Sequence, residues 1–138
     1  MNMEEAFEFM KGERLAVLST ASEDGHPEAA LMGFAVTPDL EIIFDTVKSS
    51  RKYPNLKRNP WVAWVIGCTT ETTVQYEGLA EELGGEELAK YKKIYFARFP
   101  DGPARESWPG ITYFVVRPKW VRYCDYDPNK RRIEEKEF

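Results

Sequence analysis

Residues 44–60 read FDTVKSSRKYPNLKRNP, and this stretch contains the end of a predicted strand and a predicted basic helix. Its first residues end an apolar run, Leu40 to Asp45, which predicts a strand. Small and polar residues then lead into a short basic segment with helical character. Ser49 or Ser50 is the expected N-cap of that helix, because a hydroxyl accepts from the free N–H groups of a first turn. The helix is expected to end before Pro60.

The same stretch carries the groups of an anion site. Backbone N–H groups, hydroxyls and cationic side chains would converge where the strand meets the helix. These residues are Lys48, Ser49, Ser50, Arg51 and Lys52. The alternative is a solvated basic helix face, which charge alone does not exclude.

Composition indicates a soluble globular protein of one domain, residues 1–138, with 43% hydrophobic and 30% charged residues. A net charge of −4 argues against general binding to nucleic acid or anionic membranes. No apolar run approaches the roughly 20 residues that cross a bilayer. The N-terminus is acidic where a secretion signal would be basic, so the expected location is the cytoplasm.

Cysteine and histidine are too few for several kinds of site. Cys68 and Cys124 cannot form a disulfide framework and lack metal-ligand spacing, so no metal is expected. The single histidine, His26, excludes a His-rich metal site and argues against a hydrolase triad. If the protein is an enzyme, its reactive centre is therefore expected to be a cofactor.

The remaining pattern predicts short strands, joined mainly by hairpins, around two inserted helices. The inserted helices are the short basic one after Ser49 or Ser50 and a longer one over Glu86–Phe99. A further short helix, capped by Asn2, is expected at the N-terminus and to end near Gly12. The expected strands are Arg14–Ala21, Pro27–Val36, Trp61–Ile66, Glu71–Glu81, Ile111–Val116 and Trp120–Tyr123. Residues 125–138 read as a loose, charged tail. Hairpin connections favour antiparallel pairing and a small barrel over a doubly wound sheet.

Four local features are predicted within this scheme. Asp24-Gly25 predicts a tight turn, and Gly78 predicts a β-bulge. Gly33, inside a strand, marks a close approach by a ligand or by another backbone. The almost wholly apolar strand Trp61–Ile66 is expected to be buried on both sides.

Several motifs, in this order, resemble those of the pyridoxamine 5'-phosphate oxidase-like flavoproteins. They are Ala16–Thr20 with Asp24–Pro27, Phe44–Thr46 with Ser50–Lys52, Asn55-Leu56, Asn59–Ala63 and Val74–Ala80. The likeness covers roughly residues 4 to 125 and is nearest to the general-stress-protein and flavin-reductase branches. It implies a mainly β fold, an antiparallel FMN-binding split β-barrel of six to seven strands with two or three helices. It also implies a homodimer that holds FMN in clefts at the subunit interface.

The resemblance also assigns cofactor-binding residues. Arg51 and Lys52 would pair with the FMN phosphate, supported by Ser50. Asp45 and Thr46 would line the ribityl chain or the ring. The run from Ala30 to Ala35, including Leu31, Met32 and Gly33, would lie beside the isoalloxazine. Thr73 or Gln75 would be the polar residue that opens the fifth strand.

The function implied is that of an FMN-dependent oxidoreductase acting on a small organic substrate, with a nicotinamide as the electron donor. The alternatives are a deazaflavin-dependent reductase of the same fold and a non-catalytic flavin-binding stress-response protein. The true oxidases carry arginine at the position of Ala30 and lysine at that of Ala35. They also carry a C-terminal histidine motif, whereas residues 123–135 contain no histidine. Oxidation of pyridoxamine phosphate itself is therefore not expected.

Overall fold

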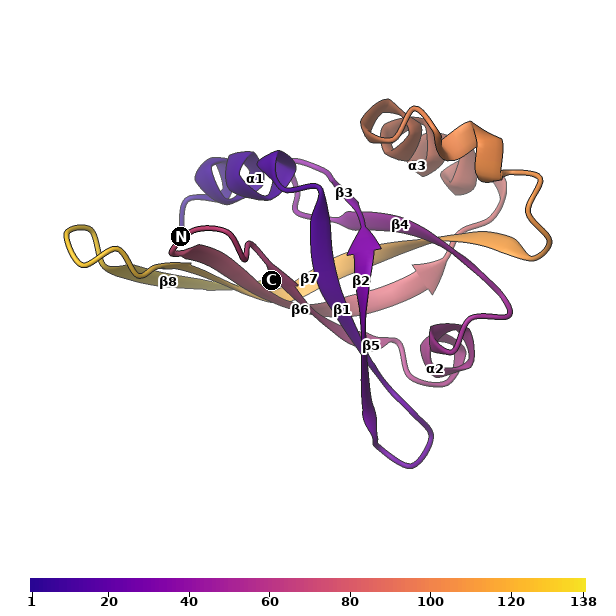
Figure 1. Ribbon diagram of the computed structural model, residues 1–138, viewed down its shortest axis with the longest axis horizontal. Coiled ribbons are helices and arrows are strands. Elements are labelled where there is room, and N and C mark those ends of the chain that lie inside the picture. The colour runs from indigo at the N-terminus through magenta and orange to yellow at the C-terminus, as the bar shows by residue number, and fades with distance from the viewer.

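The computed structural model describes residues 1–138, and its strands form one antiparallel sheet that curls upon itself (Figure 1). The helices are α1 (Met3–Gly12), α2 (Lys52–Arg58) and α3 (Gly85–Arg98), with a 3-10 turn η1 (Gly102–Arg105). The strands are β1 (Leu15–Ala21), β2 (Pro27–Gly33), β3 (Ala35–Val36), β4 (Ile42–Val47), β5 (Trp61–Ile66), β6 (Thr72–Glu82), β7 (Ile111–Asp125) and β8 (Arg132–Glu137).

The strand order explains the curled shape. Along the sheet it runs β2-β1-β5-β6-β7-β4-β3, with β8 paired to β7. The two end strands of this series, β2 and β3, are separated in the chain only by Phe34. The sheet must therefore bend until its two ends meet, which makes a half-barrel. The prediction of a mainly β, antiparallel split barrel with two or three helices is confirmed, although the sheet has eight strands instead of six to seven.

Two apolar clusters hold the sheet and helices together. The larger, of 19 buried residues, fills the inside of the curl, where the Phe44 ring stacks on Phe114 at 5.4 Å and meets Trp64 at 5.6 Å. In the smaller cluster, Tyr95 of α3 and Phe99, the residue that caps its C-terminus, pack on the other side of β4 and β7. This confirms the helix predicted over Glu86–Phe99. α1 packs on the larger cluster through Ala6 and Met10, and Figure 1 shows α1 and α3 next to opposite ends of the same upper edge of the molecule.

One long strand replaces the two strands predicted near the C-terminus. β7 runs without a break from Ile111 to Asp125, although it contains Pro118. Pro118 pairs with Gly78 at the point where the register between β6 and β7 shifts, so the N–H that proline lacks falls at an irregular part of the ladder. The predicted bulge at Gly78 is confirmed. A Cβ on Gly78 would lie 2.5 Å from the carbonyl oxygen of Arg117, so only glycine fits there.

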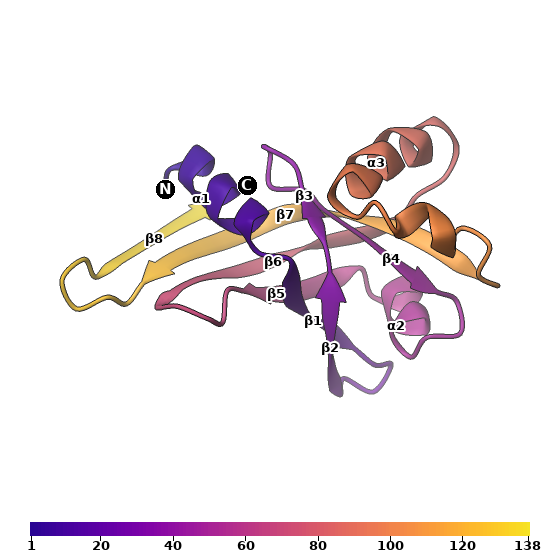
Figure 2. The ribbon, with the colours of Figure 1, turned by 45° about the horizontal axis from the view of Figure 1, so that its top comes forward.

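The predicted loose tail is wrong. Residues 132–137 form β8, which pairs with the last part of β7. Figure 2 shows this β7–β8 pair extending away from the barrel. Arg122 of β7 forms an ion pair with Glu135, and Arg132 forms one with Glu5 of α1. The strand was missed because its charged residues hide the alternation that usually identifies a strand.

β5 is buried on one side only, contrary to prediction. Val62, Trp64 and Ile66 point into the core, whereas 51% of Trp61 and 48% of Val65 is exposed. The outward side chains of β5 continue those of β1 and β2, where Val17 pairs in register with both Leu31 and Val65. We call this surface, formed by the outward residues of β1, β2, β5 and β6, the outer sheet face.

Three local predictions have simple outcomes. Gly25 adopts φ +84° in the turn between β1 and β2, as the Asp-Gly pair predicted. Asn2 caps α1, because its side chain accepts from the Glu5 N–H at 3.1 Å. Gly33 does mark a close approach, but the neighbour is a side chain: a Cβ there would lie 3.0 Å from the Phe99 ring. None of the helices has the length and hydrophobicity to span a bilayer.

Candidate functional site

The turn between β4 and α2 forms the centre of the candidate site. The prediction of a serine N-cap is wrong, because α2 begins at Lys52, its N-cap is Arg51, and no side chain caps the helix. The Ser50 N–H already bonds to the Val47 carbonyl at 2.9 Å, which holds this residue in the preceding turn. Its hydroxyl accepts instead from the Thr46 hydroxyl at 3.1 Å. The two predicted hydroxyl residues are therefore in contact.

A small pocket of about 50 Å³ lies between the start of α2 and strands β1 and β2. We call it the α2 pocket. Its walls are Leu18, Thr20, Glu28, Ala29, Ala30, Arg51 and Lys52. Three of the residues predicted to bind a cofactor, Ala30, Arg51 and Lys52, thus line one cavity.

A hydrogen-bond network fixes the wall of the α2 pocket. The Glu28 carboxylate accepts from Asn55 Nδ2 at 3.0 Å and lies 3.1 Å from Arg51 Nε. Asn55 is buried and also donates to the Thr20 hydroxyl at 3.1 Å. The amide therefore anchors α2 to β1 and β2. The Arg51 side chain is 75% exposed, so it is free to bind a second anion beside Glu28.

Lys52 differs from the other cations of this region. Burial lowers the pKa of its ammonium, and no neighbouring charge offsets that effect. By contrast, Lys57 on the same helix lies 2.9 Å from Glu82, and the hydrogen bond raises the pKa of Lys57. A half-buried ammonium without a counter-ion favours the binding of an anion, because an anion supplies the missing charge.

The structure separates Asp45 from this pocket. Adjacent residues of a strand point to opposite faces, so Thr46 faces Ser50 while Asp45 faces α3 and η1. There the Asp45 carboxylate accepts from Arg105 Nε at 2.9 Å. Burial and the Asp45 charge together raise the pKa of Tyr95 nearby. Asp45 thus holds η1 against the sheet and does not reach the α2 pocket.

The predicted residues of β2 alternate in the same way. Ala30 lines the α2 pocket and Met32 packs against the core, whereas Leu31 points outward with 64% of its side chain exposed. Gly33 lies beneath the Phe99 ring. The outer sheet face therefore begins directly beside the α2 pocket, at Leu31.

Thr73 and Gln75 lie elsewhere on the sheet. The Thr73 hydroxyl donates to the Ile66 carbonyl at 3.0 Å, and Gln75 pairs with Val65 on the outer sheet face. Both residues line a depression of about 290 Å³ that also includes Trp120. β6 is three strands from β2 in the sheet order. At about 4.8 Å a strand, this places them roughly 14 Å apart, so one chain does not unite Gln75 with the α2 pocket.

Two residues of the pocket region were missed from the sequence. Glu28 gave no signal, since it precedes two alanines in an ordinary strand pattern. Asn55 was noted only as part of a motif, although its position one turn after Arg51 on a helix would place it near the pocket. Their role depends on the contact between α2 and β2, which sequence spacing alone does not reveal.

Comparisons with known proteins can now be set beside this geometry. The sequence model of the family described as pyridoxamine 5'-phosphate oxidase matches residues 3–125. The pyridoxine/pyridoxamine 5'-phosphate oxidase of Salinibacter ruber (strain DSM 13855 / M31) is 35% identical over 100 residues, which are 72% of this chain and 45% of that protein. The chain thus covers less than half the length of this curated relative.

Two solved structures resemble the fold. A heme binding protein from Mycobacterium smegmatis gives a TM-score of 0.84 at 18% identity, covering 98% of this chain and 57% of that one. General stress protein 26 from Bacillus anthracis str. Sterne gives 0.71 at 24% identity, covering 99% and 100%. Likeness at these identities concerns the fold alone.

The sequence match and the structure agree on the family. The match spans nearly the whole chain, from α1 to the end of β7. The curled antiparallel sheet is the one that the resemblance predicts. The chain belongs to the pyridoxamine 5'-phosphate oxidase family of split β-barrel proteins.

Proposed function

We propose that this protein binds FMN as a homodimer and acts as an oxidoreductase on a small organic substrate, with electrons from a nicotinamide. The observation that carries the proposal is Lys52. Burial lowers the pKa of its ammonium, which forms no ion pair with an opposing charge, and Arg51 lines the same pocket. A phosphate monoester in the α2 pocket would supply that opposing charge.

The residues of the pocket fit a phosphate group. Arg51 and Lys52 would donate charge-assisted hydrogen bonds to its oxygens. Ser50 precedes Arg51 in the chain, and its hydroxyl is in contact with that of Thr46. Glu28 opposes an anion, but its carboxylate already accepts from Asn55 and forms an ion pair with Arg51. A flavin, when bound, supplies the hydride or electron transfer. The chain's residues bind it, orient it and exclude water.

The size of the α2 pocket supports a site completed by a second chain. A volume of about 50 Å³ suits a small anion, not a three-ring system. The ring would extend onto the adjoining outer sheet face, where 48% of Val65 and 64% of Leu31 is exposed. Apolar surface of this kind marks an interaction site. A second copy on this face would cover the ring and would bring Gln75 or Thr73 of the partner toward its polar edge.

The absorption spectrum of the purified protein tests the proposal. We expect the visible bands of an oxidised flavin, and their bleaching by NADH or NADPH under anaerobic conditions. The Arg51→Ala/Lys52→Ala variant should lose the flavin, while Arg58→Gln, at the other end of α2, should retain it. A flavin that remains at full occupancy in the double variant would contradict the phosphate assignment.

Other spectra would point to the other candidates. A flavin band that no nicotinamide bleaches indicates a non-catalytic flavin binder. A colourless protein that binds an added deazaflavin in preference to FMN indicates the deazaflavin alternative. A Soret band would indicate haem, a cofactor disfavoured by the presence of a single histidine, His26, whose side chain is 79% exposed in the β1–β2 turn.

A further inference from the structure

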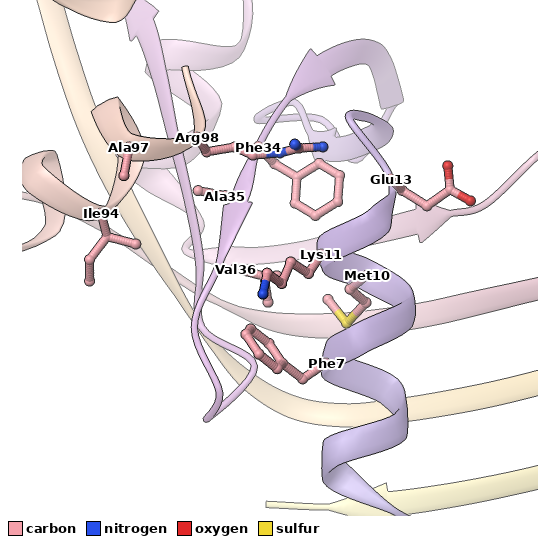
Figure 3. Close-up of a pocket in the computed structure, with 10 residues that line it drawn as sticks. All are labelled: Phe7, Met10, Lys11, Glu13, Phe34, Ala35, Val36, Ile94, Ala97 and Arg98. Atoms are coloured by element: carbon pink, nitrogen blue, oxygen red, sulfur yellow. The ribbon is translucent and has the colours of Figure 1, made fainter. Parts of the chain in front are cut away.

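The gap between α1 and α3 contains a groove that is separate from the α2 pocket. Its volume is about 360 Å³, and seven of the ten residues that line it are hydrophobic. Its floor consists of Phe34, which joins β2 to β3, and the two residues of β3, Ala35 and Val36 (Figure 3). None of its lining residues belongs to the α2 pocket or to the depression at Gln75.

The walls of the groove are mainly apolar, but two cationic side chains, Lys11 and Arg98, also line it. Phe7 and Met10 of α1 form one wall, and Ile94 of α3 stands opposite (Figure 3). Arg98 reaches from α3 toward the Phe34 ring, and Lys11 reaches from α1 toward Val36.

Neither cation is neutralised by a carboxylate. Lys11 Nζ lies 5.6 Å from the centre of the Phe7 ring, and the Arg98 guanidinium lies 6.0 Å from that of Phe99. Both cations thus lie near aromatic rings, and neither forms an ion pair within 4 Å. Glu13 also lines the groove, but Figure 3 shows its carboxylate directed away from the Phe34 floor. The groove thus combines an apolar interior with unpaired positive charge.

We infer that this groove binds a small carboxylate with an apolar body, such as an aryl-alkyl or medium-chain alkyl carboxylate. Its volume lies within the roughly 300–1,000 Å³ of small-molecule sites, which are mostly apolar with a few polar groups that orient the ligand. The planar guanidinium of Arg98 matches a carboxylate, which it can bind through two parallel hydrogen bonds. Phe7, Val36 and Ile94, which line the groove and keep part of their surface exposed, would bury the hydrocarbon part. This site goes beyond the proposed flavin function and does not depend on it.

Calorimetric titration of the full chain, as purified, with 4-phenylbutyrate and with decanoate tests the inference. We expect saturable binding of at least one of them with a Kd below about 1 mM. The neutral analogue 4-phenyl-1-butanol should bind at least tenfold more weakly, since it carries no negative charge and cannot accept the two parallel hydrogen bonds that a carboxylate accepts from a guanidinium. No saturable binding of either carboxylate, or equal binding of the alcohol, would overturn the inference.

Variants locate the site. Lys11→Gln/Arg98→Gln should weaken carboxylate binding tenfold or more, whereas Lys90→Gln/Lys93→Gln removes two exposed lysines of α3 outside the groove and should leave it unchanged. Ala97→Trp fills the groove from the exposed side of α3 and keeps both charges, so it should abolish binding without a change in fold. Unchanged affinity in the first or the third variant would refute the assignment. Flavin content is measured separately in each protein, so its loss would concern only the proposed function.

Discussion

Replacing Lys52 by methionine should change the stability of the flavin-free protein and its FMN affinity in opposite directions. Burial lowers the pKa of Lys52 below the ordinary value of 10.5, so the folded state disfavours the charged ammonium. This cost is fully present below the folded pKa and is relieved as pH rises from the folded toward the unfolded pKa. Methionine keeps the length of the side chain without the charge. The flavin-free variant should therefore be at least as stable as the native protein at pH 7, with the difference shrinking toward pH 10.5.

FMN binding should respond in the other direction. A charge-assisted hydrogen bond contributes about 1.5–3 kcal/mol, so its loss should raise the Kd for FMN roughly 10- to 150-fold. Titration of flavin-free protein, followed by quenching of FMN fluorescence, measures this change. Urea unfolding of the same samples measures the free energy of unfolding.

Lys57→Met is the matched control on the same helix. Lys57 lies 2.9 Å from Glu82, and that hydrogen bond raises the pKa of Lys57, so its charge is stabilised in the folded state. This variant should lose stability and keep its FMN affinity within about twofold. If Lys52→Met instead lost stability and kept its FMN affinity, Lys52 would be a structural residue and the phosphate assignment would be refuted.

Three further predictions address the neighbouring groups. Glu28→Gln keeps an acceptor for Asn55 and frees Arg51, so FMN should bind about tenfold more tightly by fluorescence titration; weaker binding would mean that Glu28 positions Arg51. Val65→Lys places a charge on the outer sheet face, and sedimentation should show a monomer that no longer retains FMN; a flavin-loaded dimer would contradict this. Glu82→Gln should lower the free energy of unfolding by about 1–3 kcal/mol at pH 7 in urea titrations. Burial raises the pKa of Glu82, but hydrogen bonds from Thr112, Lys57 and Tyr53 outweigh this effect and lower that pKa. The difference in stability between the variant and the native protein should therefore vanish as pH falls below about 4.5 and through the lowered pKa. A difference that persists in acid would exclude this explanation.

The parts of the fold that the sequence predicted depend on local chemistry. The Asp24-Gly25 turn, the bulge at Gly78 and the apolar spacing of α3 each follow from a few adjacent residues. The parts that it did not predict depend on partners distant in the chain. Pro118 does not break β7 because it faces the bulge on β6, and β8 is held in part by Glu5 of α1.

The candidate site shows the same division. Sequence order placed Arg51 and Lys52 together, and the α2 pocket contains both. The resemblance assigned Asp45 and Thr46 to one surface. They are neighbours in β4, however, and adjacent side chains of a strand point to opposite faces, a local rule that separates the two residues. Glu28 enters the pocket only through the packing of α2 on β2, so no spacing in the sequence could indicate it.

The interior of the barrel is an additional reason to place a flavin ring outside it. Trp64, Phe44 and Phe114 fill the curl and are almost fully buried, so the core has no space for a planar cofactor. The α2 pocket has room for a small anion only. A ring attached to that anion must therefore lie on the surface, and the nearest apolar surface begins at Leu31. Left open to water on one side, the ring would lose much of its burial free energy. A second copy on the outer sheet face would restore it, and the same contact would explain why a strand as apolar as β5 leaves Trp61 and Val65 uncovered in a single chain.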